Sequence, residues 1–244
     1  MLSDVYNRVE IFYKEEKRAV QPRRLVITID GPAGVGKSTV SKCLASRLHY
    51  GYLDTGALYR AIAWKVQQAQ LEPHDLVQIE SLLSRTSLQL IADHNSFSIR
   101  IDDQPVIQEE LRTPVISQLA SSIAVLPIVR EWLLPAQQEI GAAGGVVAEG
   151  RDMGTRVFPD ADIKFFLEAD VDVRASRRQQ ELAGKGQTVP LDRVREEMVM
   201  RDNRDRHRAL GPLRPAPQAI MIETSHQSVD DVVSHMMGMI ADRL

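Results

Sequence analysis

Short apolar segments alternate with longer amphipathic segments along most of the chain. The short ones are LVITID at 25–30, GYLDTG at 51–56, VVAEG at 146–150, IKFFLEA at 163–169 and AIMIET at 219–224. Apolar runs of this length, rich in β-branched residues, are typical of strands that are buried on both faces of a parallel sheet. The pattern therefore predicts five parallel strands.

Segments with a helical spacing of apolar residues separate these strands. They cover 37–48, 54–69, 73–84, 108–143, 171–182, 191–210 and 229–244. Pro114, Pro127 and Pro135 are expected to divide or kink the longest one. Because strands and helices alternate, the chain is predicted to be an α/β protein of three layers, with helices on both faces of one sheet.

Two regions depart from this alternation. Residues 87–107 alternate apolar and polar side chains around two pairs of turn-forming residues, which predicts a small antiparallel β insert at about 85–110. Residues 3–18 place apolar residues at helical spacing among charges, which predicts a short helix in an N-terminal extension covering 1–24. The main domain is expected to cover residues 25–244.

Composition limits the partners and the location of the protein. With 244 residues, 43% of them hydrophobic, and a net charge of −3, the chain can bury one sizeable core and gives no indication of nucleic acid or membrane binding. Cys43 is the only cysteine, which excludes a disulfide framework. No apolar run approaches the roughly 20 residues that span a bilayer, and the first residues mix charges with apolar groups. We expect a cytoplasmic protein.

A phosphate-binding motif lies between the first two predicted elements. Residues 31–38, GPAGVGKS, match G-x-x-x-x-G-K-[ST] directly after a strand and before a helix. Glycine freedom lets backbone N–H groups converge on phosphate oxygens, Lys37 would neutralise the β- and γ-phosphates, and Ser38 would bind Mg²⁺. The sequence thus predicts a P-loop sandwich. Its predicted ATP-binding residues are Gly31, Pro32, Ala33, Gly34, Val35, Gly36, Lys37, Ser38 and Thr39.

Every class of P-loop protein shares this loop, so the phosphate acceptor has to be identified from other motifs. From about Leu25 onward the chain carries LVITIDGPAGVGKSTVSK, YLDTGALYRA, AEGRDMGTRVFPDADIKFFLEA, RASRR and RDNRDRHRALGPL. In order and spacing these segments resemble the bacterial cytidylate kinase family of P-loop nucleoside monophosphate kinases. The resemblance implies ATP-dependent phosphorylation of CMP and dCMP, assisted by Mg²⁺, by a monomer.

The resemblance also implies an acceptor site. Arg60 and Arg151 would hold the acceptor phosphate, and Asp152 would recognise cytosine by accepting from its amine. Ser121, Arg130 and Arg208 would contact the base, and Arg201 and Asp205 the ribose. The complete predicted acceptor site is Thr55, Tyr59, Arg60, Ser121, Arg130, Arg151, Asp152, Arg201, Asp205 and Arg208.

Three arginines, Arg174, Arg177 and Arg178, are spaced to share one helix face, where their like charges repel. The resemblance makes the segment from about 170 to 190 a helical lid whose arginines close over the transferring phosphoryl group. The alternative is a solvated basic face. The predicted catalytic residues are Lys37, Arg151, Arg174, Arg177 and Arg178.

Several alternatives stay open at this point. Tyr59 is equally an ordinary core residue of an amphipathic helix, and Glu149 either orients Mg²⁺ or forms a structural ion pair. The acceptor is alternatively UMP or another small molecule. A P-loop regulatory NTPase is the alternative from another class. An acceptor phosphate is already a nucleophile, so the kinase hypothesis requires no general base.

Overall fold

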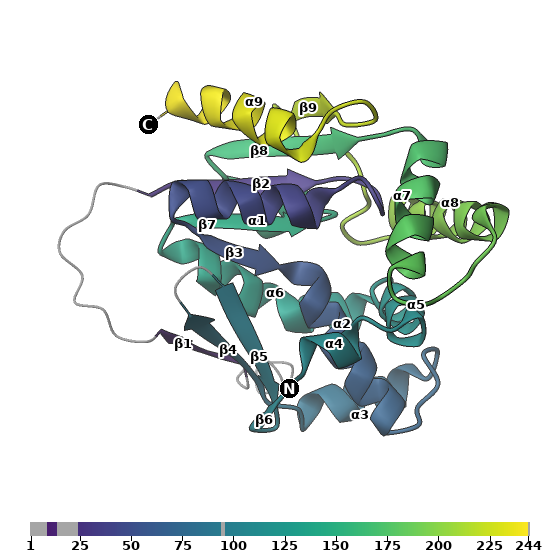
Figure 1. Cartoon of the computed structure of the whole chain (residues 1–244). Helices are drawn as coiled ribbons and strands as arrows, with labels where there is room; N and C mark the ends of the chain where they lie inside the picture. The colour runs from purple at the N-terminus through teal and green to yellow at the C-terminus, as the bar shows by residue number, and fades with distance from the viewer. Residues whose placement is uncertain (1–8, 14–23, 94–95, 244) are drawn as a thin grey trace.

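Five parallel strands form the centre of the molecule (Figure 1). The structure is a computed structural model, and it describes residues 9–13, 24–93 and 96–243. The strands lie in the order β3 (Gly51–Asp54), β7 (Val146–Gly150), β2 (Val26–Asp30), β8 (Ile163–Glu168) and β9 (Ile220–Glu223). All four neighbouring pairs are parallel, which confirms the five predicted strands.

Helices cover both faces of this sheet and complete the three predicted layers (Figure 1). On one face, α1 (Lys37–Leu48) and α9 (Val229–Ala241) pack with Ile27, Phe165 and Val233 in one apolar core. On the other face, α2 (Thr55–Gln68), α5 (Pro114–Ile123) and α6 (Pro127–Ala142) build a second core around Trp132. Burial of both faces explains why the strands are continuously apolar.

Prolines divide the predicted helical region 108–143 as expected. It contains α4 (Gln108–Leu111), and then Pro114 and Pro127 each stand in the first turn of their helix, α5 and α6. Proline is tolerated there because the first N–H groups of a helix have no intrahelical acceptor. Pro135 lies inside α6, which continues past it. Helix α3 (Leu76–Ser84) precedes this region.

The predicted insert is a small antiparallel sheet that joins the edge of the main one. Strands β4 (Leu88–Asp93) and β5 (Ser96–Ile101) pair antiparallel, and β6 (Gln104–Pro105) adds to β5. Residue Tyr52 of β3 pairs with Ser96 of β5. The antiparallel insert is therefore confirmed, and it is continuous with the parallel strands.

The helix predicted over residues 3–18 is wrong for its described part. Residues Val9–Tyr13 form strand β1, which pairs parallel with β4. The segment VEIFY is rich in β-branched and aromatic residues, and the edge of β4 offers its unpaired backbone groups as a template. The rest of the predicted helix lies outside the described residues.

Two further helices stand at the carboxyl end of the sheet (Figure 1). They are α7 (Val171–Ala183), which follows β8, and α8 (Leu191–His207), and they pack against each other through Ala175, Leu182 and Val194. In the described part of the chain no single helix is long and apolar enough to cross a membrane; α5 and α6 reach the required length only together, and they are bent by 98°.

Candidate active site

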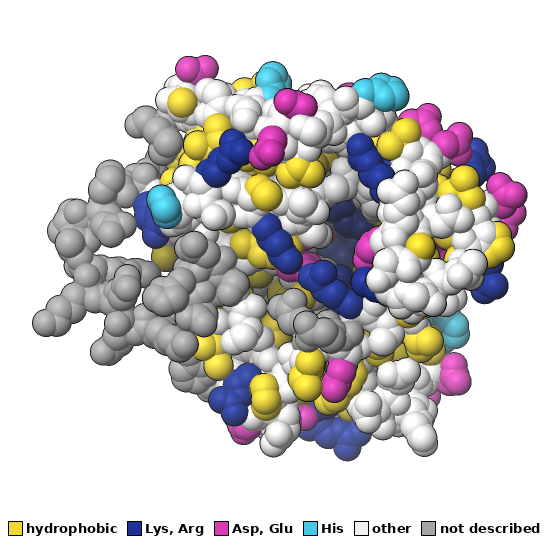
Figure 2. Space-filling model, viewed as in Figure 1, with side chains coloured by type: hydrophobic (Ala, Val, Ile, Leu, Met, Phe, Trp, Pro, Cys, Tyr) yellow, Lys and Arg dark blue, Asp and Glu magenta, His cyan; other side chains and the backbone are white. Residues whose placement is uncertain are grey.

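A cavity of about 690 Å³ opens at the carboxyl ends of the parallel strands. Figure 2 shows this hollow bordered by Lys and Arg side chains. Its lining holds eight cationic residues against five carboxylates, an excess that favours an anionic ligand. The cationic residues are Lys37, Arg60, Arg130, Arg151, Arg177, Arg178, Arg201 and Arg208.

The P-loop, which connects β2 to the first turn of α1, forms one end of the cavity. Two of its glycines have a positive φ and a close neighbour, and one of them is also required by space. A Cβ atom on Gly31, where φ is +150°, would lie 2.3 Å from the carbonyl oxygen of Leu167. On Gly34, where φ is +73°, it would lie 2.5 Å from the Cε atom of Met198. Gly31 is therefore required by the backbone of β8, whereas at Gly34 the tip of Met198 could move and the positive φ is what favours glycine.

Lys37 is nearly buried at this end, with 6% of its surface exposed, and its Nζ donates to the Pro32 carbonyl at 2.6 Å. Burial lowers the pKa of the Lys37 ammonium well below its ordinary value, and the adjacent Arg151 guanidinium lowers it further. Burial likewise lowers the pKa of Arg201 to about 10, with Arg151 acting in the same direction. These cations crowd one another, and a bound anion would restore their preference for the charged form.

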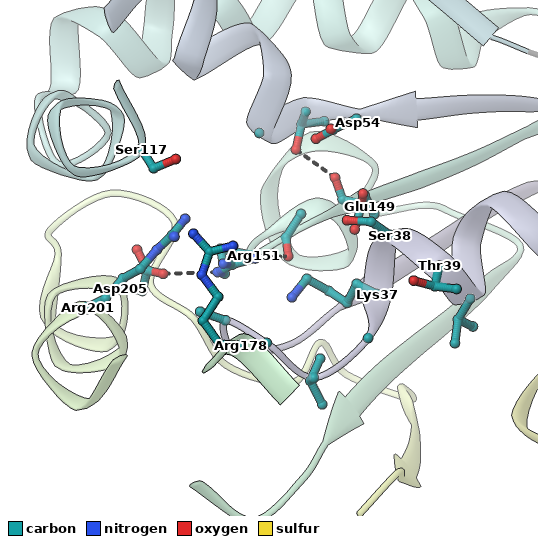
Figure 3. A pocket seen from close by; sticks show the side chains of 18 of the residues that line it. Lys37, Ser38, Thr39, Asp54, Ser117, Glu149, Arg151, Arg178, Arg201 and Asp205 are labelled. Atoms are coloured by element: carbon teal, nitrogen blue, oxygen red, sulfur yellow. Dashed lines mark hydrogen bonds and ion pairs between the residues drawn. The ribbon is translucent and has the colours of Figure 1, made fainter. Parts of the chain in front are cut away.

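Oxygen ligands for a cation lie beside Lys37. The Glu149 carboxylate, at the end of β7, hydrogen-bonds the Ser38 hydroxyl and accepts from the Tyr52 hydroxyl. Burial raises the pKa of Glu149, and the Asp54 carboxylate adds to the rise. In Figure 3 Ser38, Glu149 and Asp54 lie close together next to Lys37. A hydroxyl and carboxylates grouped in this way are the ligands that Mg²⁺ prefers.

Asp152 organises the opposite end of the cavity. It is 2% exposed, and its two oxygens accept from different arginines: Oδ2 from Arg130, and Oδ1 from Arg208 at 3.1 Å. Arg208 also donates through Nε to the carbonyl of Gly211 at 2.6 Å. The guanidinium of Arg130 lies 5.5 Å from the centre of the Tyr59 ring. The carboxylate is therefore held in one orientation by two arginines, one from α6 and one directly after α8.

Arg151 and Asp205 connect the two ends. The Nε of Arg151 donates to Asp205 Oδ2 at 2.9 Å, and its Nη1 donates to the carbonyl of Gly150 at 3.1 Å. Burial opposes ionisation of Asp205, but the positive charges of Arg151, Arg201 and Arg208 together hold its pKa below the usual range. Figure 3 shows Arg151 between Lys37 and the α8 residues Arg201 and Asp205.

The first turn of α2 supplies the wall between the ends. Asp54 caps this helix by accepting from the Ala57 N–H at 3.0 Å, and its other oxygen pairs with Arg60 at 2.7 Å. The hydroxyl of Thr55 donates to the Glu149 carbonyl at 2.7 Å. Thr55, Tyr59 and Arg60 all line the cavity, and Tyr59 also packs against the core on that side of the sheet. Tyr59 therefore faces both the cavity and the core, and its role in acceptor binding stays a prediction.

Four residues that line this cavity each have a buried polar side-chain atom without a hydrogen-bond partner among the described residues. These atoms are Arg60 Nε, Ser121 Oγ, Arg130 Nε and Arg201 Nε. A buried polar atom without a partner costs free energy, about 1–3 kcal/mol each, and such groups in folded proteins have a reason to persist. Four of them around one cavity indicate a ligand with several hydrogen-bonding groups.

Helix α7 contributes two of its three predicted arginines to the cavity. Arg177 and Arg178 line it, with Arg177 donating to the Thr224 carbonyl at 2.6 Å and Arg178 pairing with Glu181 at 2.7 Å. Arg174, the third arginine of the predicted face, does not line the cavity. Its guanidinium is buried outside the lining, against Ala33 and Asp202, because Arg174 lies on the same helix face one turn nearer the start of α7, next to the P-loop.

The other predicted residues converge as the motifs indicated. All ten residues of the predicted acceptor site line the cavity, and seven of the nine predicted ATP-binding residues do so. Gly31 and Pro32 are the two exceptions. Gly31 packs against the backbone of Leu167, and the carbonyl of Pro32 accepts from Lys37. Sequence reasoning missed three residues with direct contacts to the site, namely Asp54, Tyr52 and Asp202. Asp54 is the first residue of a predicted helical segment, and Asp202 is one of many charged residues in α8, so neither is marked by its sequence context.

A phosphate-binding loop and a second, arginine-rich subsite in one cavity define a P-loop nucleotide-binding protein with room for two ligands. The family model described as cytidylate kinase matches residues 27–242. The chain belongs to the cytidylate kinase family.

Curated relatives agree with this assignment. The cytidylate kinase of Syntrophotalea carbinolica is 41% identical over 91% of this chain and 94% of that protein, and the cytidylate kinase of Geobacillus thermodenitrificans is 39% identical over 91% and 99%. The bifunctional pantoate ligase/cytidylate kinase of Synechococcus sp. strain JA-2-3B'a(2-13) is 46% identical over 86% of this chain but only 39% of that protein. The chain thus spans about two fifths of the length of the bifunctional relatives it matches.

Proposed function

We propose that the protein transfers the γ-phosphoryl group of ATP to CMP and dCMP, producing CDP and dCDP. The observation that carries this proposal is one shared cavity, with the P-loop at one end and four residues with an unpartnered buried polar atom toward the other, namely Arg60 Nε, Ser121 Oγ, Arg130 Nε and Arg201 Nε. The names of the full-length relatives support the same substrates. We further propose a cytoplasmic monomer that binds these small molecules and no nucleic acid.

The donor end fits ATP with Mg²⁺. The N–H groups of the P-loop and the positive end of α1 would hold the phosphates, with Thr39 beside the α-phosphate. Ser38 and Glu149 fit Mg²⁺ because their oxygens lie side by side at the predicted position of the β- and γ-phosphates. Mg²⁺ would supply charge neutralisation there.

The acceptor end fits a nucleoside monophosphate with an exocyclic amine. Asp152 would accept from the cytosine amine, held in place by Arg130 and Arg208, and Ser121 would offer its hydroxyl to the ring edge. Arg201 and Asp205 would hold the ribose. Arg60 and Arg151 would hold the acceptor phosphate, with Thr55 and Tyr59 as the wall of the subsite.

The transfer step requires alignment and charge neutralisation. An oxygen of the acceptor phosphate forms a bond to the γ-phosphorus, while the bond to the β–γ bridging oxygen breaks and ADP leaves with that oxygen. Lys37, Arg151, Arg177 and Arg178 would neutralise the charge that is shared between donor and acceptor oxygens. No proton has to be removed from an anionic acceptor, so the mechanism assigns no general base.

Closure would exclude water from this reaction. We propose that residues from about 170 to 190, which carry Arg177 and Arg178, form a lid on the main domain of residues 25–244. Within that domain the insert at about 85–110 stands beside β3. Residues 1–24 are proposed to be an N-terminal extension, whose strand β1 joins the insert by pairing with β4.

The test is ADP formation from ATP and Mg²⁺ with CMP, dCMP, UMP, AMP and GMP. We expect turnover with CMP and dCMP to exceed turnover with the other monophosphates by at least about tenfold, the scale of one well-placed hydrogen bond to a charged group. A preference for UMP would show that UMP, and not CMP, is the acceptor. ADP formation that is independent of every monophosphate would support a regulatory NTPase instead.

A further inference from the structure

Arg174 of α7 and Asp202 of α8 form a buried ion pair next to the cavity. The Nη1 of Arg174 lies 2.6 Å from Oδ2 of Asp202, and the two side chains are 6% and 3% exposed. The Nε of Arg174 also donates to the Ala169 carbonyl at 3.0 Å. The guanidinium is therefore fixed from two sides, and it faces the P-loop instead of the cavity.

Both members of the pair also bind the same residue of the P-loop. The Nη1 of Arg174 donates to the carbonyl of Ala33 at 3.0 Å. The N–H of Ala33 donates to Oδ1 of Asp202 at 3.1 Å. The two polar backbone groups of Ala33, the residue before Gly34, are thus satisfied by one ion pair from two different helices.

The helices that supply this pair also supply residues of the cavity. Helix α7 carries Arg177 and Arg178, and α8 carries Arg201 next to Asp202. Ala33 itself packs into a small apolar cluster formed by Ala175, Leu182, Val194 and Met198. The contact at Ala33 is therefore the point where the phosphate-binding loop meets both arginine-bearing helices.

A purely stabilising role explains this arrangement poorly. A buried ion pair adds little net stability compared with apolar side chains of the same size, because both charges lose their hydration. A buried ion pair instead fixes the orientation of the groups that it contacts, because its hydrogen bonds have defined directions. Here the directions converge on one residue of the loop that cradles phosphate.

We propose that Arg174 and Asp202 are positioning residues for the phosphate-binding loop. By holding both backbone groups of Ala33, they fix the loop against α7 and α8. The donor phosphates then meet the arginines of both helices at a constant distance. The proposal rests on the proposed function for the identity of the reaction, but its first readout requires only nucleotide binding at the P-loop.

The test compares Arg174→Met, Arg174→Lys, Asp202→Asn and the control Arg193→Met in the full chain. Arg193 is an exposed arginine of α8 that pairs with Glu197. The dissociation constant of Mg·ADP is measured by calorimetry without any acceptor, well below the melting temperature of each variant. KM for ATP, KM for CMP and kcat are measured separately.

We expect Arg174→Met to weaken Mg·ADP binding and to raise KM for ATP by about 10- to 100-fold, the cost of a misplacement of about 1 Å. KM for CMP should change less than about threefold. Asp202→Asn keeps an oxygen for the Ala33 N–H, so its effect should be smaller, and Arg174→Lys should recover part of the loss because it retains one donor. Arg193→Met should match the wild type.

An unchanged Mg·ADP affinity in folded Arg174→Met, with only a lower melting temperature, would overturn the proposal. If Arg174→Met does not fold, Arg174→Lys and Asp202→Asn decide by the same comparison, and wild-type Mg·ADP affinity in both would overturn it. A wild-type protein that forms no ADP with CMP would refute the proposed function alone. The Mg·ADP measurement would still decide the role of the pair.

Discussion

The two ends of the cavity are built in different ways. The proposed donor end is built mainly from one continuous segment, the P-loop with Lys37, which Glu149 of β7 joins beside Ser38. The acceptor end is assembled from side chains on α2, α5, α6, α8 and the segment after β7, with Asp152 held between Arg130 and Arg208. A backbone cradle recognises charge and shape, whereas a network of paired side chains can distinguish one base from another. Substitutions should therefore affect rate at the donor end and selectivity at the acceptor end.

The largest effect is expected from Lys37→Met. Loss of this cation should lower kcat/KM by about 10²- to 10³-fold, because charge stabilisation at the transferring phosphoryl group is lost. CMP and dCMP should suffer equally, since Lys37 lies at the donor end. Lys164→Met is the matched control, because Lys164 also donates to a proline carbonyl five residues earlier but lies outside the cavity lining. A selective loss with one acceptor would contradict the division between the two ends.

A pH-dependent effect on stability is expected from Asp30, which links the two ends. It precedes the P-loop, and its oxygens accept from the N–H groups of Met153 and Gly154 at 2.9 and 2.8 Å, just after Asp152. Burial raises the pKa of Asp30 from 3.8 to about 6, so the folded state binds this proton more tightly than the unfolded state. The corresponding stability is present below about pH 4 and is lost as pH rises through about 6.

The measurement is the free energy of unfolding in urea for the wild type and Asp30→Asn across this range. Relative to the variant, the wild type should lose up to about 3 kcal/mol between pH 4 and pH 7. Asp231→Asn should show the opposite sign at lower pH, because the Ser228 hydroxyl lowers the pKa of Asp231 from 3.8 and the wild-type stability from this group is lost as pH falls below about 4. A difference between wild type and Asp30→Asn that does not change with pH would contradict this role.

Asp152→Asn tests selectivity at the acceptor end. We expect kcat/KM for CMP to fall by about 10- to 100-fold, the range of a hydrogen bond to a charged group, and the preference for CMP over UMP to narrow. The isosteric amide keeps the site filled, although it weakens the bonds to Arg130 and Arg208. Asp160→Asn, on the exposed turn before β8, should leave both kinetic constants unchanged. An equal loss for CMP and UMP would show that Asp152 acts on folding or phosphate binding instead.

The smallest effect is expected from Ser121→Ala. Its hydroxyl is buried without a partner among the described residues, so removal should not lower the melting temperature. KM for CMP should rise by about 3- to 10-fold through loss of one hydrogen bond. Ser122→Ala, whose hydroxyl donates to the Gln118 carbonyl on the same helix, should leave KM unchanged. Equal KM values for both variants would exclude Ser121 from the acceptor site.

Much of the fold could be predicted because it follows from patterns of neighbouring residues in the sequence. The five strands are continuous apolar runs, and the helix breaks at Pro114 and Pro127 follow from proline geometry. Strand β1 could not be predicted, because its pairing with β4 joins segments about 80 residues apart and its five residues are too few to establish a period.

The donor end could likewise be predicted from eight contiguous residues. The acceptor end could be predicted only through motifs that resemble a known family, because its residues come together from five places in the chain. Arg174 shows the limit most clearly. Spacing alone places it with Arg177 and Arg178, yet packing against Ala33 and Asp202 decides which arginines face the cavity. Tyr52 could not be predicted as a site residue, because its contact with Glu149 joins two strands that are far apart in the sequence.

The most direct test of the central claim follows the labelled γ-phosphate of ATP in a single turnover with CMP. If both ends of the cavity act together, the label should appear in CDP, at a rate that falls with Lys37→Met and with little release as inorganic phosphate. Label that appears only in inorganic phosphate, or on the protein, would contradict transfer between the two ends.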